Sequence, residues 1–153
     1  MVYSVVSSED KNAVSMEFFS SKKIPLRNMH SVGNLNVLAE QLVLGDVVWV
    51  VDVNRFGSVI TYWNFYQICK QKGVSIKFLA NPYLNYAKDK RLKGSYEKLI
   101  VYMISIEQKI ATDICRAFND VNVAEVQRYA GCISVNILGQ IFSTDGILKR
   151  TSA

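Results

Sequence analysis

The chain has 153 residues, 50% hydrophobic and 20% charged, a balance that fits a folded domain and excludes a disordered chain. Its longest apolar stretch, around residues 42–53, contains Asp46 and is too short to span a bilayer. The formal net charge of +5 favours a polyanionic partner. Residues 1–5 lack the features of a signal peptide. We therefore expect a cytoplasmic protein that does not contact a membrane.

The cysteines and the histidine give no pattern of a metal site. Cys69, Cys115 and Cys132 are widely separated, and His30 is the only histidine. No paired spacing suggests zinc ligands or a disulfide framework, so we expect reduced thiols and neither metal nor cofactor. The chain also lacks a glycine-rich phosphate loop, which argues against a nucleotide-binding domain.

The first part of the chain alternates β-prone runs with helical patterns. Residues 2–6 are a predicted strand, and Ser7-Ser8-Glu9-Asp10 is typical of a helix start. Residues 24–29 form a weaker predicted strand. The apolar spacing over 35–42 then predicts a helix that stops at Gly45.

The middle of the chain completes the pattern of an open sheet. Residues 47–53 are apolar almost throughout, which predicts a strand buried on both faces. A helix after Gly57 ends at Gly73, and residues 74–79 form the next predicted strand. Alternating strands and helices predict an α/β fold with a mostly parallel sheet flanked by helices.

A long apolar helix is predicted over residues 96–118. Its apolar arc is too broad for one packing partner, so we expect it to form a homodimer as well as to cover its own sheet. The arc is formed by one stripe and two residues that widen it: Leu99, Met103, Ile106, Ile110, Ile100 and Ile104.

A domain boundary is predicted at Asn119-Asp120, which separates a domain over 1–118 from a small helical tail over 119–153. In the tail, Asn122 can cap a helix that turns at Gly131, and Ser134 starts a second short helix. Two interpretations stay open: a helix-turn-helix that reads DNA, or a helical hairpin that covers the edge of the sheet.

The densest basic run spans residues 88–93, and it is either a solvated loop or a loop that contacts phosphates. If the chain binds double-stranded DNA, basic side chains of this run supply backbone contacts, with polar side chains of the tail as further candidates. These candidates are Lys88, Lys90, Arg91, Lys93, Asn136 and Gln140.

Two motifs resemble those of one enzyme family. The strand over 47–53 is preceded by Gly45-Asp46 and ends in Asn54-Arg55-Phe56-Gly57-Ser58. In the resolvase/invertase group of serine recombinases, the same strand follows Gly-Asp and ends in Asp-Arg-Leu-Gly-Arg. Residues 3–10 resemble the family opening Tyr-Ala-Arg-Val-Ser-Thr with acidic residues after it. Residues 72–76 and 105–110 resemble later family segments, so the likeness covers residues 2–118.

The resemblance implies a resolvase-like fold, a long dimerisation helix and covalent transfer of a DNA phosphodiester without metal or nucleotide. Ser7 matches the nucleophilic serine, and Arg55 matches the first arginine of the strand-end motif. Three arginines of the family pattern are replaced, by Val5, Val32 and Ser58. The resemblance therefore implies a site-specific recombinase with impaired activity. The alternative is a catalytically degenerate member that acts in DNA binding or assembly.

Overall fold

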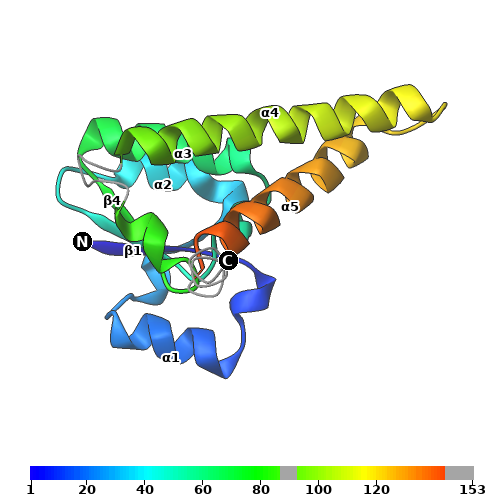
Figure 1. Cartoon of the computed structure of the whole chain (residues 1–153). Helices are drawn as coiled ribbons and strands as arrows, with labels where there is room; N and C mark the ends of the chain where they lie inside the picture. Colours follow the sequence, from blue (N-terminus) through cyan, green and yellow to red (C-terminus); the bar gives the residue numbers. More distant parts are fainter. Residues whose placement is uncertain (87–92, 144–153) are drawn as a thin grey trace, which may run out of the picture.

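The computed structural model describes residues 1–86 and 93–143, and in these residues a four-stranded sheet has the order β2-β1-β3-β4 (Figure 1). Every neighbouring pair of strands is parallel. The strands are β1 (Val2–Val6), β2 (Met29–Ser31), β3 (Val47–Val50) and β4 (Ser75–Phe78). The expected α/β fold with a parallel sheet is confirmed.

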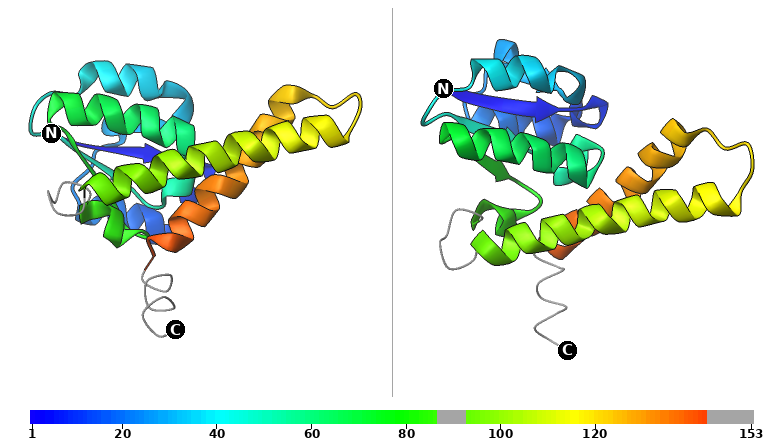
Figure 2. Two further views of the ribbon diagram at one scale, coloured as in Figure 1. Left: turned by 45° about the horizontal axis from the view of Figure 1, so that its top comes forward. Right: turned by 90° about the horizontal axis from the view of Figure 1, so that it is seen from above.

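Helices cover both faces of the sheet. Helix α1 lies on one face, and α2 and α3 lie on the other, with α4 running alongside α3 (Figures 1 and 2). The α-helices are α1 (Ala13–Ser21), α2 (Leu35–Gln41), α3 (Val59–Lys72), α4 (Lys93–Ala117) and α5 (Val123–Ile141). Short 3-10 turns connect them: η1 (Ser8–Asp10), η2 (Leu26–Asn28), η3 (Val32–Asn34), η4 (Val53–Phe56) and η5 (Pro82–Tyr86).

The main core lies between the sheet and the α2/α3 layer. Val5 on β1 pairs with Val50 on β3, and both side chains are fully buried there. The opposite face is less well covered, because Val47 and Trp49 of β3 keep partial exposure. The expectation that the run 47–53 is buried on both faces is therefore wrong for the face toward α1.

Most predicted elements lie where the periodicity places them, and the weak strand is shifted. The sequence pattern places it over 24–29, whereas β2 begins at Met29. Pro25 caps the turn η2 instead, and proline has no N–H to give to a sheet ladder.

Helices α4 and α5 form an antiparallel pair. The second half of α4 and the first half of α5 project beyond the body of the domain in every view, and we call this projection the helical arm (Figures 1 and 2). None of the helices in the described ranges combines the length and the apolar character needed to cross a bilayer.

The tail does not contain the two short helices that its glycine suggested. Helix α5 runs for 19 residues through Gly131 without a turn. Gly131 serves close packing instead, since a Cβ atom there would lie 2.7 Å from Ser58 Cβ and 3.0 Å from Gly57 O. The expectation of a helix-turn-helix built around this glycine is therefore wrong.

Candidate functional site at the carboxyl edge of the sheet

Ser7 follows β1 directly and caps the turn η1. Its Oγ accepts a hydrogen bond from the backbone N–H of Glu9 at 3.3 Å, and its own N–H donates to Asp10 Oδ2 at 3.0 Å. This reciprocal arrangement is a capping box, in which one side chain at each end satisfies a free N–H. Among the described residues, no side chain that could act as a base bonds Ser7 Oγ.

Arg55 lies in η4, just beyond β3, and its guanidinium is bound by carboxylates. Nε donates to Asp10 Oδ1 at 2.9 Å, and Nη1 donates to Glu9 Oε2 at 2.8 Å. Nη1 also donates to Asn54 Oδ1 at 2.8 Å. The Arg55 side chain is 10% exposed, Asp10 is 2% exposed and Glu9 is 70% exposed. The pair with Asp10 is thus buried, and the pair with Glu9 is at the surface.

Ser7 and Arg55 are joined through one carboxylate, because Asp10 accepts from both. Asp10 also accepts from Ser15 Oγ at 3.4 Å, which ties the start of α1 to the same group. The two residues proposed from the family motif therefore lie at one edge of the sheet. The Asp10 carboxylate between them balances the charge of the Arg55 guanidinium, which leaves less of that charge for a phosphate.

Ser58 occupies the position of the second strand-end arginine, and it caps α3. Its Oγ accepts from the N–H of Thr61 at 3.1 Å and lies 2.8 Å from Thr61 Oγ1. Helix α5 covers this corner through Gly131. Val5, at the position of the arginine in the opening motif, is fully buried in the core.

Glu107 was not identified from the sequence, although a lone acid in the apolar stripe of the long helix is a usable signal. It is 7% exposed and accepts from the N–H of Val59 at 2.9 Å and from Ser134 Oγ. Its carboxylate lies at the amino end of α3, where the helix dipole favours negative charge. Glu107 therefore joins α3, α4 and α5 at this corner.

Helix α5 passes over η4 and is fixed there by two amides. Asn54 Nδ2 donates to Asn136 Oδ1 at 3.1 Å. Asn81, 1% exposed, accepts from the N–H of Val53 at 2.8 Å and donates to the carbonyl of Gly139 at 2.8 Å. A Cβ atom at Gly139 would lie 3.2 Å from an Asp52 oxygen, so glycine permits this approach.

The structure describes the side chains of only two of the six residues predicted to bind DNA. Asn136 reaches the carboxyl edge through its bond to Asn54, and Gln140 is exposed one turn further along α5. Lys88, Lys90 and Arg91 lie outside the described residues. Lys93 begins α4, but its side chain is not among those described.

A groove of about 840 Å³ adjoins this corner, between the amino end of α3 and the helical arm. Its polar lining includes Ser58, Thr61, Thr112 and Gln127, and Arg128 is its one cation among the described residues. A single cation attracts a polyanion only weakly.

Comparison with known proteins assigns no relative. No model of a known protein family matches the sequence, and no curated protein matches it. Neither comparison therefore places the chain in a family.

Proposed function

We propose that this chain is a serine-recombinase-like protein that binds double-stranded DNA but has lost efficient strand cleavage. The proposal is supported by the motif resemblance over residues 2–118 and by a parallel α/β sheet. We infer the loss of catalysis from the hydrogen bonds that the Arg55 guanidinium donates to the carboxylates of Asp10 and Glu9.

Phosphoryl transfer requires donors that are free to meet the developing charge. Arg55 directs Nε and Nη1 to carboxylates, and its side chain is largely buried. Removal of one preorganised donor typically reduces rates by about 10²–10³-fold. At two family arginine positions this chain has a core valine, Val5, and a helix cap, Ser58. Such a site stabilises the transition state poorly.

DNA binding in this proposal is weak and led by phosphate contacts. The net charge of +5 and the basic run over 88–93 are its basis. Phosphate neutralisation releases counterions, so affinity falls steeply as salt rises.

Covalent trapping on a nicked suicide duplex tests the loss of catalysis. The wild-type chain should form no serine-linked adduct, while duplex binding remains measurable at low salt. The matched control is Ser7→Ala, which should behave like wild type in both assays. Efficient adduct formation by the wild-type chain alone would refute the proposal.

A second candidate is a working serine recombinase, favoured by the shared contact of Ser7 and Arg55 with Asp10. In that case, Arg55 exchanges its carboxylate partners for a DNA phosphate on binding. Ser7→Ala should then abolish an adduct that wild type forms, and Arg55→Ala should reduce it by at least about 10²-fold.

A further inference from the structure

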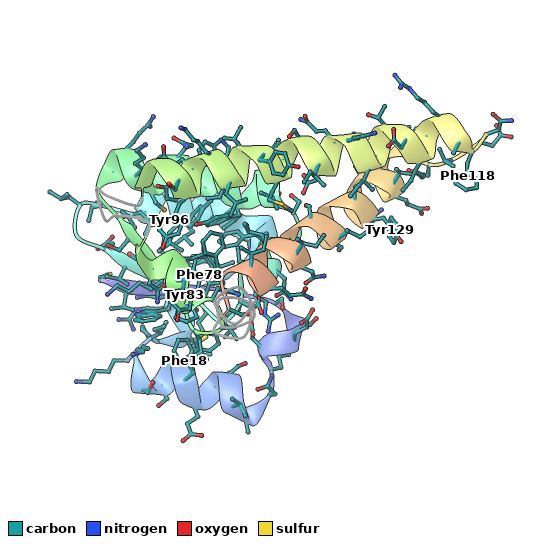
Figure 3. All side chains as sticks on the ribbon, viewed as in Figure 1. Phe18, Phe78, Tyr83, Tyr96, Phe118 and Tyr129 are labelled. Atoms are coloured by element: carbon teal, nitrogen blue, oxygen red, sulfur yellow. The ribbon has the colours of Figure 1, made fainter. Side chains whose placement is uncertain are left out.

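The face of the sheet toward α1 carries a partly exposed aromatic side chain, Trp49. Register aligns Ser4, Trp49 and Lys77 in one row across β1, β3 and β4. Trp49 is partly exposed, and Phe18 of α1 packs edge-on against it with ring centroids 5.6 Å apart. Figure 3 labels Phe18 on the side of α1 that faces the strands.

Two ammonium groups lie over this indole ring. Lys22 Nζ is 4.5 Å from the Trp49 ring centroid, and Lys77 Nζ is 5.6 Å from it. Both lysines are exposed. Each contact is favourable by itself, but two like charges share one ring and repel each other. An anion placed between them would relieve that repulsion.

The positive charge continues past Lys22 toward the amino edge of the sheet. Lys23 and Arg27 line a hollow of about 470 Å³ there, next to Asn28. No carboxylate in residues 1–86 or 93–143 forms an ion pair with Lys22, Lys77 or these two cations. The sequence of α1 contains one acid, the exposed Glu17.

We propose that this basic-aromatic surface, formed by Lys22, Lys23, Arg27, Trp49 and Lys77, binds single-stranded nucleic acid. A base stacks on Trp49, which requires one lysine to move aside. The phosphates of the strand contact the lysines and the arginine as the strand runs toward the hollow. Proteins that bind single strands combine these two elements, aromatic platforms and a cationic track.

The chemistry of the surface favours a single strand over other anions. Bases in a duplex are already stacked on each other, so the indole ring gains nothing from them. An acidic peptide could use the cations, but it has no planar base for the ring. The surface lies on the α1 side of the sheet and does not include Ser7, Arg55 or α5, so the inference is independent of the proposed function.

Fluorescence anisotropy with labelled oligo-dT and oligo-U tests the inference, with the full chain at low salt. Lys22→Ala combined with Lys77→Ala should weaken binding at least about tenfold and lower the salt slope by about 0.7 for each phosphate that is no longer neutralised. Trp49→Leu should weaken binding by about 5- to 150-fold, because it removes the stacking platform and keeps apolar volume. The matched control, Lys98→Ala with Lys109→Ala, removes two exposed charges from α4 and should leave binding unchanged.

Several outcomes would overturn the inference. These are unchanged binding in the Lys22/Lys77 double variant, equal binding of polyglutamate, or binding of anionic vesicles without binding of oligonucleotides. Circular dichroism checks the fold of Trp49→Leu. If that variant is unfolded, the oligonucleotide affinity of the Lys22/Lys77 double variant decides the test. Neither Trp49 nor the substituted lysines lie at the carboxyl edge that holds Ser7 and Arg55, and duplex binding is measured separately, so failure here and failure of the duplex proposal are distinguishable.

Discussion

Arg55 and Asp10 form a buried ion pair, with Arg55 Nε 2.9 Å from Asp10 Oδ1, although 45 residues separate them in the chain. The pair connects the end of β3 to the turn after β1. It places the arginine of the candidate site in direct contact with a buried carboxylate, so the geometry of the site depends on Asp10.

Asp10→Asn should destabilise the fold by about 3 kcal/mol, because it leaves a largely buried guanidinium without its main counter-charge. It also weakens the capping box at Ser7. Urea unfolding measures the loss. The matched control is Glu9→Gln, which removes the other carboxylate on Arg55. Glu9 is 70% exposed, so its loss should cost less than about 1 kcal/mol. Equal costs for the two variants would contradict this account of the pair.

Gly131→Ala should also destabilise the protein, because the new Cβ atom would lie 2.7 Å from Ser58 Cβ and 3.0 Å from the Gly57 carbonyl. Overpacking of this kind typically costs about 1–3 kcal/mol. Thermal unfolding measures the change. Gly94→Ala is the control within α4, where no atom of the described residues lies within 4 Å of the new Cβ. That variant should gain up to about 1 kcal/mol from helix propensity. A neutral or stabilising Gly131→Ala would show that α5 does not pack closely here.

Stability should decline at alkaline pH through Tyr66. Burial, with the nearby negative charge of Glu97, raises the pKa of Tyr66 from 10.0 to about 12. The folded state therefore keeps its proton where the unfolded state loses it. The part of the unfolding free energy that depends on the Tyr66 proton is fully present below pH 10.0. It is lost as pH rises toward about 12, at up to about 1.4 kcal/mol per pH unit.

Tyr66→Phe should flatten this part of the pH profile of the unfolding free energy. Tyr102→Phe is the control, because Tyr102 is 61% exposed. A profile that keeps its alkaline slope in Tyr66→Phe would assign the slope to other groups, such as Tyr62, whose pKa is also raised by burial.

Local patterns predicted most of the fold. The helix over Val59–Lys72 ends at Gly73, where φ is +70°, which is the conformation that a glycine stop signal implies. The site was less predictable. Ser7 and Arg55 were identified from motifs, but their bonds to Asp10 depend on the folded chain and leave no local pattern. The turn predicted at Gly131 is wrong for a related reason. In the sequence, a glycine required for close packing cannot be told from a glycine required for a turn.

The outer surface of α4 remains the expected dimer contact. Most of the broad apolar arc is covered within the chain, because Ile100 and Met103 are buried in its core and Leu99, Ile104 and Ile106 pack against that core. On the remaining surface, Val101 is 51% exposed and Tyr102 is 61% exposed. These two exposed apolar side chains are the candidates for the contact, and we expect a homodimer at micromolar concentration.

Light scattering of the purified chain measures the mass directly. Val101→Glu with Tyr102→Glu should yield a monomer with unchanged helix content, because neither side chain belongs to the core. The matched control is Val14→Glu on α1, which adds charge at a site that is 73% exposed and should leave the dimer intact. A wild-type chain that stays monomeric at high micromolar concentration would show that the exposed face of α4 has another role. If both α4 and α1 variants dissociate the dimer equally, the effect is one of net charge and not of this surface.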